Sequence, residues 1–150
     1  MLGGVAAATA LFYALRSRSP EPRATFEQQD QRERERIEHG AVLYAAHCAE
    51  CHVNRLEGQP GWEHRKPDGT YPAPPHDETG HTWHHPDWQL LSIVKLGGQA
   101  TARPNFRSNM PAFGDKLGDD DIRAVLTFIK SRWPPEIRRR QEKANQGRHP

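Results

Sequence analysis

Two cysteines and one histidine form the most chemically specific group in this sequence. Cys48 and Cys51 stand three positions apart, and His52 follows the second cysteine directly. On one turn of helix both thiols lie on the same side, where each can form a thioether with a vinyl group of a porphyrin. The imidazole that follows can then bind the iron from one face. The pattern therefore predicts covalent attachment of one haem c, with His52 as the proximal ligand.

Two other interpretations of the cysteine pair are weaker. A structural zinc site needs four ligands, and because the chain has only two cysteines, histidines such as His81, His84 and His85 would have to complete it. A thioredoxin-like redox pair lies beside a βαβ pattern, whereas the residues around Cys48 and Cys51 have helical periodicity. Haem remains the cofactor that the motif predicts.

Met110 is the candidate for the second axial ligand, since the chain contains only one methionine besides Met1. Pro111 follows it, restricts Met110 to extended backbone and stiffens the surrounding loop. A thioether is a soft, weak donor that favours ferrous iron, so a His/Met pair raises the reduction potential and suits electron transfer. The alternative is that Met110 fills a gap in the hydrophobic core.

Together these features resemble a class I c-type cytochrome over about residues 36 to 134. The resemblance is carried by Cys48 to His52, by Met110-Pro111 and by the run from Leu117 to Ile122 before a final amphipathic helix. It implies an all-α, cytochrome c-like bundle of short helices around one haem, in which the N- and C-terminal helices cross. It also implies a one-electron carrier that is not an enzyme, with redox proteins as partners. The expected location is the periplasm or the extracytoplasmic face of the membrane.

Apolar periodicity indicates the helices that must hold these ligands. The helix before Cys48 has an apolar face with Gly40 and Tyr44, and the resemblance implies that the terminal helix crosses there. A second helix is predicted from Pro86 to Leu96, ended by Gly97 and Gly98. The terminal helix carries one apolar stripe behind an acidic first turn. That stripe consists of Ile122, Val125, Leu126, Ile129 and Trp133.

The segment from Val53 to His85 is predicted to be a loop that wraps the haem edge. Its many prolines disfavour a long helix or a central strand. The resemblance implies that a proline carbonyl accepts the second N–H of the proximal imidazole, and Pro60 or its neighbour Gly61 is the candidate. The alternative is that Pro60 is an ordinary turn residue.

Histidines are concentrated in residues 76–85 at the end of this loop, and His81, Trp83, His84 and His85 are candidates for haem-edge contacts or a second metal site. Three interpretations compete: Trp83 packs on the porphyrin while donors bind a propionate, the imidazoles bind copper or zinc, or the loop docks a redox partner. The loop also resembles that of small monohaem cytochromes associated with copper-handling proteins. A copper-linked haem protein and a ligand-sensing haem protein are therefore the alternative functions.

The chain is expected to have four parts. Residues 1–18 contain an uncharged stretch from Leu2 to Leu15 that is shorter than the about 20 residues of a membrane span, and we expect a membrane anchor or the remnant of an export signal. Residues 19–35 are expected to be a polar linker and 36–134 the cytochrome c domain. Residues 135–150 are expected to be a basic tail that is solvated; the alternatives are that it meets anionic lipid or steers an acidic partner. Nucleic-acid binding is not indicated, because no aromatic platform or binding motif is present.

Overall fold

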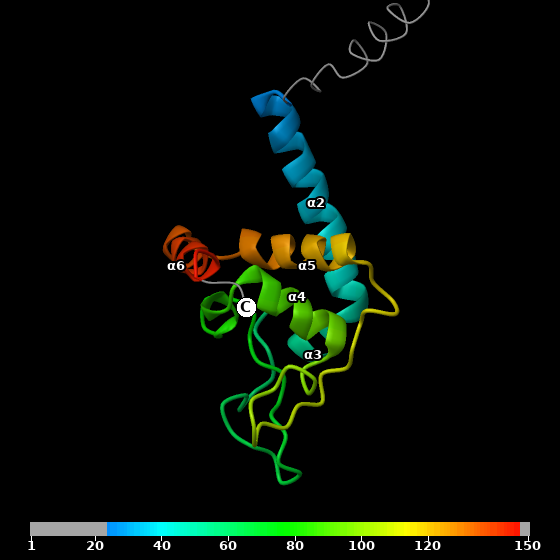
Figure 1. Cartoon of the computed structure of the whole chain (residues 1–150), viewed down its shortest axis with the longest axis vertical. Coiled ribbons are helices and arrows are strands. Elements are labelled where there is room, and N and C mark those ends of the chain that lie inside the picture. The colour runs from blue at the N-terminus through cyan, green and yellow to red at the C-terminus, as the bar shows by residue number, and fades with distance from the viewer. Residues whose placement is uncertain (1–23, 148–150) are drawn as a thin grey trace, which may run out of the picture. The chain divides into compact units, whose positions relative to one another are not determined.

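The computed structural model describes residues 24–147, and the elements in this range are helices (Figure 1). In chain order they are α2 (Phe26–His47), α3 (Ala49–His52), the 3-10 helix η1 (Thr82–His84), α4 (Asp87–Leu96), α5 (Asp119–Ser131) and α6 (Pro135–Asn145). The all-α prediction is confirmed. No helix among the described residues is long and apolar enough to cross a membrane. The expected anchor or signal remnant, residues 1–18, lies outside the described residues.

The chain divides into two compact units, Met1–Gln31 and Arg32–Pro150. Of the first unit the structure describes residues 24–31, which include the first turns of α2. The second unit carries all the candidate site residues, and the contacts that follow lie within it unless stated.

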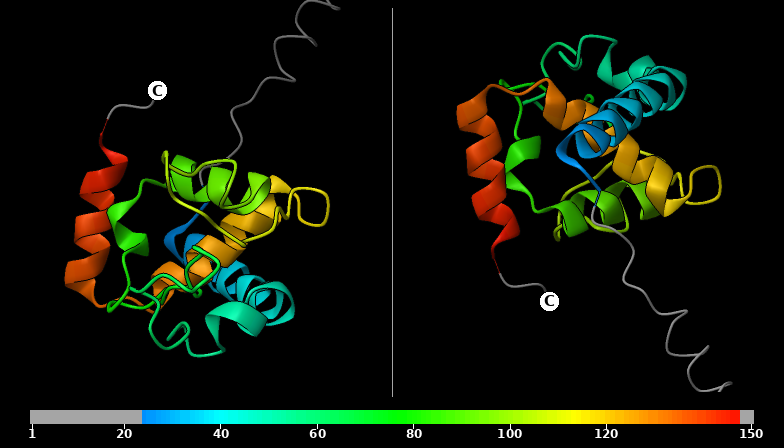
Figure 2. Two further views of the ribbon diagram at one scale, coloured as in Figure 1. Left: turned by 90° about the horizontal axis from the view of Figure 1, so that it is seen from below. Right: turned by 90° about the horizontal axis from the view of Figure 1, so that it is seen from above.

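The predicted crossing of the first and last helices is present between α2 and α5 (Figures 1 and 2). Gly40 permits it: a Cβ atom at this position would lie 2.5 Å from the carbonyl carbon of Ala124. Below the crossing Tyr44 is 1% exposed, and its ring centre lies 5.5 Å from that of Phe128. Around these rings a core cluster forms, made of Tyr44, Leu56, Val125, Phe128, Ile129, Trp133 and Ile137. We call this group the main core cluster.

A second, smaller cluster lies between α4 and α5, and it contains Leu90, Leu117, Ile122 and Leu126. The boundaries of α4 agree with the sequence to within one residue, since Pro86 precedes its first turn and Gly97 ends it. The carboxylate of Asp119 in the first turn of α5 accepts a hydrogen bond from the Lys95 ammonium at 2.7 Å. This contact fixes the start of α5 beside the end of α4.

The prediction of a polar linker over residues 19–35 is wrong from Phe26 onward, because α2 begins there and continues to His47. A reciprocal cap starts the helix: the Thr25 N–H donates to the Gln28 side chain at 2.9 Å, and the Gln28 N–H donates to the Thr25 hydroxyl at 3.3 Å. This capping box satisfies amides that the first turn leaves without helical partners. The charged residues that suggested a solvated linker occupy exposed positions on the helix.

The expected solvated tail after residue 134 is also wrong for residues 135–145, which form α6. Pro135 suits the first helical position, where its missing N–H costs no hydrogen bond. One face of α6 is buried: Ile137 joins the main core cluster, and Gln141 is 2% exposed. The Gln141 amide donates to the Asp87 carboxylate at 2.6 Å and to the His85 carbonyl at 3.3 Å. The helix lies beside η1 (Figure 2).

Two irregular loops are joined to each other beyond the helices. Thr70 and Arg107 form an isolated parallel bridge, and the rings of Tyr71 and Phe106 stack with centres 5.1 Å apart. The Arg65 guanidinium donates to the Asn105 carbonyl at 2.8 Å. These contacts hold the proline-rich loop after α3 against the loop that contains Met110.

Candidate functional site

The cysteine motif lies on α3, a short helix that continues the path of α2 after a turn at Cys48. The Cys48 N–H donates to the Tyr44 carbonyl at 2.9 Å, and the His52 N–H donates to the Cys48 carbonyl at 2.9 Å. Cys48 is partly buried, Cys51 is exposed, and both are free thiols. Burial, together with the nearby Cys51 thiol, raises the pKa of Cys48 to about 11. One helical turn thus presents two unpaired thiols next to His52.

His52 is buried, and its ring is fixed by a backbone acceptor. Nδ1 lies 2.8 Å from the Pro74 carbonyl oxygen; a carbonyl can only accept, so Nδ1 carries the proton and Nε2 keeps its lone pair. Burial lowers the pKa of His52, although the bond to Pro74 opposes this shift. A neutral imidazole with one nitrogen held by a backbone carbonyl is the usual state of a metal-binding histidine.

The acceptor is therefore Pro74, and the expectation for Pro60 is wrong. Pro60 is exposed. The chain instead turns back through Leu56 and Gly58, so that residues 73 to 76 lie beside the motif: the Gln59 N–H donates to the Ala73 carbonyl at 2.8 Å. Counting residues from His52 did not reveal this return path.

His76 is a site residue that the sequence places in the histidine-rich segment 76–85 but does not single out from the other histidines. Its ring stacks on that of His52, with ring centres 3.9 Å apart and planes inclined by 21°. The Nδ1 atom of His76 is buried and has no hydrogen-bond partner. Burial, and to a lesser degree the neighbouring His52 and His81, lowers the pKa of His76 well below its usual value. A signal was present in the histidine-rich composition of the segment, but composition does not say which imidazole turns inward.

Met110 lies in the loop between α4 and α5, and backbone contacts hold it on both sides. The Gly98 N–H donates to the Met110 carbonyl at 3.1 Å, and the Met110 N–H donates to the Ser108 hydroxyl at 3.2 Å. After Pro111 the Phe113 N–H donates to the Val94 carbonyl at 3.0 Å. The loop is therefore fastened to the last turn of α4, and the Met110 side chain is partly buried.

The histidine-rich segment forms ring pairs. His81 stacks near Trp62, with ring centres 5.8 Å apart, and Trp83 stacks on His84 at 3.6 Å. The Trp83 ring also packs against the main core cluster and lies 5.5 Å from the Arg140 guanidinium of α6. Burial lowers the pKa of His81 and of His85. Within residues 24–147 no group of three or more His, Cys, Asp and Glu side chains is placed to hold a metal ion.

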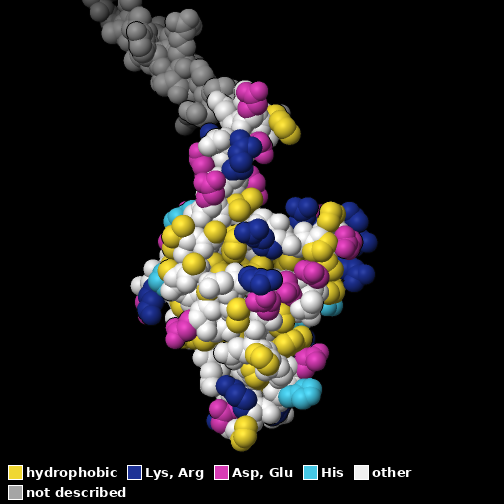
Figure 3. Space-filling view, turned by 180° about the vertical axis from the view of Figure 1, so that it is seen from behind, with side chains coloured by type: hydrophobic (Ala, Val, Ile, Leu, Met, Phe, Trp, Pro, Cys, Tyr) yellow, Lys and Arg dark blue, Asp and Glu magenta, His cyan; other side chains and the backbone are white. Residues whose placement is uncertain are grey.

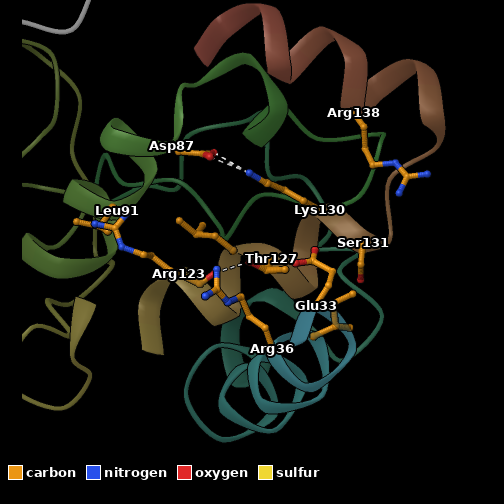
Figure 4. Close-up of a pocket in the computed structure, with 11 residues that line it drawn as sticks. Glu33, Arg36, Asp87, Leu91, Arg123, Thr127, Lys130, Ser131 and Arg138 are labelled. Carbon is orange, nitrogen blue, oxygen red and sulfur yellow. Dashed lines mark hydrogen bonds and ion pairs between the residues drawn. The ribbon is translucent and has the colours of Figure 1, made fainter. Parts of the chain in front are cut away.

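A cavity of about 500 Å³ lies where side chains of α2, α4, α5 and α6 meet (Figure 4). Its lining includes Arg36, Arg123 and Arg138 together with the Lys130–Asp87 ion pair at 2.8 Å. None of the predicted haem-contacting residues lines this cavity. It is thus distinct from the cysteine–histidine site.

Comparison with family models decides the assignment, because the model described as Cytochrome c matches residues 37–133. The chain belongs to the cytochrome c family. Comparison with curated proteins and with solved structures gave no match. The cofactor is therefore covalent haem c, Cys48 and Cys51 have the spacing of its attachment motif, and the role is that of a haem electron-transport protein.

The residues present fit this haem. The thiols are unpaired, and the Pro74 carbonyl leaves only Nε2 of His52 free for iron.

The family match ends at Trp133, so α6 lies beyond it. The match is to the family as a whole and gives no support to the narrower resemblance to cytochromes associated with copper-handling proteins.

Proposed function

We propose that this cytochrome is a one-electron carrier in which His52 and Met110 are the two axial ligands of a single haem. The state of His52 carries the proposal, since its buried, neutral ring donates from Nδ1 to Pro74 and offers only Nε2 to iron. When bound, the haem supplies a one-electron couple between ferric and ferrous iron. The thioether of Met110 is the donor whose chemistry favours the ferrous state.

The fastening of both ligand loops supports a role in electron transfer. The Asn109 amide donates to the Thr70 hydroxyl at 3.3 Å, which links the Met110 loop to the loop that carries Pro74. Gly98 and Ser108 hold the Met110 backbone from two sides. Ligands fixed by such surrounding bonds keep their geometry when the charge on the iron changes. Little reorganisation at the site favours rapid exchange of a single electron.

Replacement of Met110 by alanine tests the ligand assignment. We expect Met110→Ala to keep haem attached on a denaturing gel, because the thioethers are unchanged. The ferrous variant should bind carbon monoxide in a visible spectrum, whereas the wild type should not. Ala112→Ser, an exposed change in the same loop, should behave as the wild type. Equal carbon monoxide binding by wild type and Met110→Ala would exclude methionine ligation and favour the ligand-sensing alternative.

Family members typically act outside the cytoplasm, and we propose that this cytochrome exchanges electrons there with redox proteins. The charge on α6 supports an acidic partner: Lys and Arg side chains gather over this helix (Figure 3). They include Arg138, Arg139, Arg140 and Lys143. Complementary charge mainly accelerates encounter, so the rate should depend on ionic strength.

A further inference from the structure

We propose that His76 is a positioning residue of the haem site, whose ring fixes the orientation of the His52 imidazole and favours the ferric state. The inference rests on the proposed function, because it requires His52 to bind the iron. His76 is far from His52 in the sequence, and the return of the proline-rich loop brings the two rings into contact.

The geometry is that of a close, nearly parallel stack. The ring centres of His52 and His76 are 3.9 Å apart and the planes differ by 21°. By comparison, the rings of Tyr71 and Phe106 lie 5.1 Å apart. The contact covers the face of His52, whereas the Pro74 carbonyl acts on its edge. Together they restrain both where the ring points and how it is rotated.

His76 is itself held from several directions. The backbone N–H of His76 donates to the Leu56 carbonyl at 2.7 Å, and its backbone carbonyl accepts a hydrogen bond from the Trp133 indole at 2.7 Å. The ring of Tyr44 meets it edge-on, with ring centres 6.0 Å apart. The stack on His52 therefore rests on the main core cluster, and the position of the ring is not left to a flexible loop.

The buried Nδ1 atom of His76 argues against a purely structural role. It has no hydrogen-bond partner, and burial of an unpartnered polar atom is unfavourable. An aliphatic side chain of similar size would fill the same space without this cost. What imidazole provides and an aliphatic side chain does not is a polarizable, flat π face against the ligand.

That face should act on the redox equilibrium. Positive charge on the His52 imidazole is greater when the iron is ferric, and a π face stabilises adjacent positive charge. His76 should therefore lower the reduction potential relative to an aliphatic residue. Loss of the stack should also free the His52 ring to rotate, and that effect is separate from stability.

The test compares His76→Leu and His76→Phe in the holoprotein. We measure the reduction potential and the haem methyl resonances of the ferric form, whose order reports the orientation of the axial imidazole plane. His76→Leu should shift the redox equilibrium about three- to tenfold toward ferrous iron, tenfold being ~59 mV for one electron. It should also reorder the methyl resonances, whereas His76→Phe, which keeps a flat ring, should retain the wild-type order. His64→Leu is the control, because His64 lies in the same loop at an exposed position.

A wild-type potential and methyl order in His76→Leu would overturn the proposal. So would equal changes in His76→Leu and His76→Phe, or an equal change in His64→Leu. If His76→Leu does not assemble, His76→Gln removes the ring with a different side chain, and the same two readouts apply. Absence of covalent haem from the wild type on a denaturing gel would instead refute the proposed function, before any variant is compared.

Discussion

At the scale of single residues, the backbone around Gly58 controls how His52 is held. Gly58 has a φ of +68°, and a Cβ atom there would lie 2.6 Å from the carbonyl carbon of Pro74. Its N–H also donates to the His52 carbonyl at 3.1 Å. Any side chain at Gly58 would thus push on the residue that accepts the imidazole N–H.

Gly58→Ala and Gly61→Ala form a matched pair that isolates this contact. Gly61 has a nearly equal φ of +71°, but a Cβ atom there meets nothing within 4 Å. Both variants should lose about 1–2 kcal/mol from left-handed backbone strain, and Gly58→Ala should lose about 1–3 kcal/mol more from overpacking. Denaturant unfolding of the holoprotein measures the difference. Only Gly58→Ala should raise the reduction potential, and equal potentials would contradict the coupling to Pro74.

At the scale of helices, periodic apolar residues were sufficient to predict α4 and α5 from the sequence. The start of α2 and the whole of α6 were not predicted, because a cap determines the first and a few buried residues determine the second. α2 starts ten residues before the predicted domain boundary at 36, because Thr25 and Gln28 cap each other. The tail prediction failed for α6 because a single apolar residue, Ile137, enters the core among many charged ones. In both cases the decisive groups are too few to produce a periodic pattern.

At the α2–α5 crossing, replacing Gly40 by alanine would have two opposite effects on the free energy of unfolding. Helix propensity alone would make Gly40→Ala stabilising by about 1 kcal/mol. The new Cβ atom would however lie 2.5 Å from the Ala124 carbonyl carbon, and overpacking costs about 1–3 kcal/mol. We expect net destabilisation in denaturant unfolding. Val42→Ala, at a position 68% exposed on the same helix, should change the free energy of unfolding by less than about 0.5 kcal/mol. A stabilised Gly40→Ala would mean that the helices do not cross this closely.

The burial of α6 can be tested through Ile137. If residues 135–145 were a solvated tail, Ile137→Ala would have almost no effect on stability. Because Ile137 is 8% exposed within the main core cluster, we expect a loss of about 2–4 kcal/mol in thermal or denaturant unfolding. Arg139→Ala, at an exposed position of the same helix, should be close to neutral. Equal stability of the two variants would show that α6 does not pack on the core in solution.

At the scale of the whole molecule, the site divides into a part that sequence could predict and a part that depends on the fold. Cys48, Cys51 and His52 are neighbours on one turn, so their juxtaposition follows from spacing alone. Pro74 and His76 reach His52 only because the loop returns through Gly58 and is tied by backbone hydrogen bonds. Local motifs predicted the cofactor; the groups that tune it come from distant segments whose path no periodicity encodes.

The holoprotein is near neutral, because the polypeptide has a formal net charge of +2 and the haem adds two propionates. In a nearly neutral protein, the cations of α6 contribute a large share of the electric field that an anionic oxidant meets, and three of the four can be replaced together. Replacing Arg138, Arg139 and Lys143 by glutamine should slow oxidation by ferricyanide about two- to fivefold at low ionic strength, and added salt should remove the difference. Stopped-flow mixing of the ferrous protein measures both. Glu136→Gln with Glu142→Gln, in the same helix, should accelerate the reaction. A rate that responds to neither change would mean that α6 does not face the path of the electron acceptor.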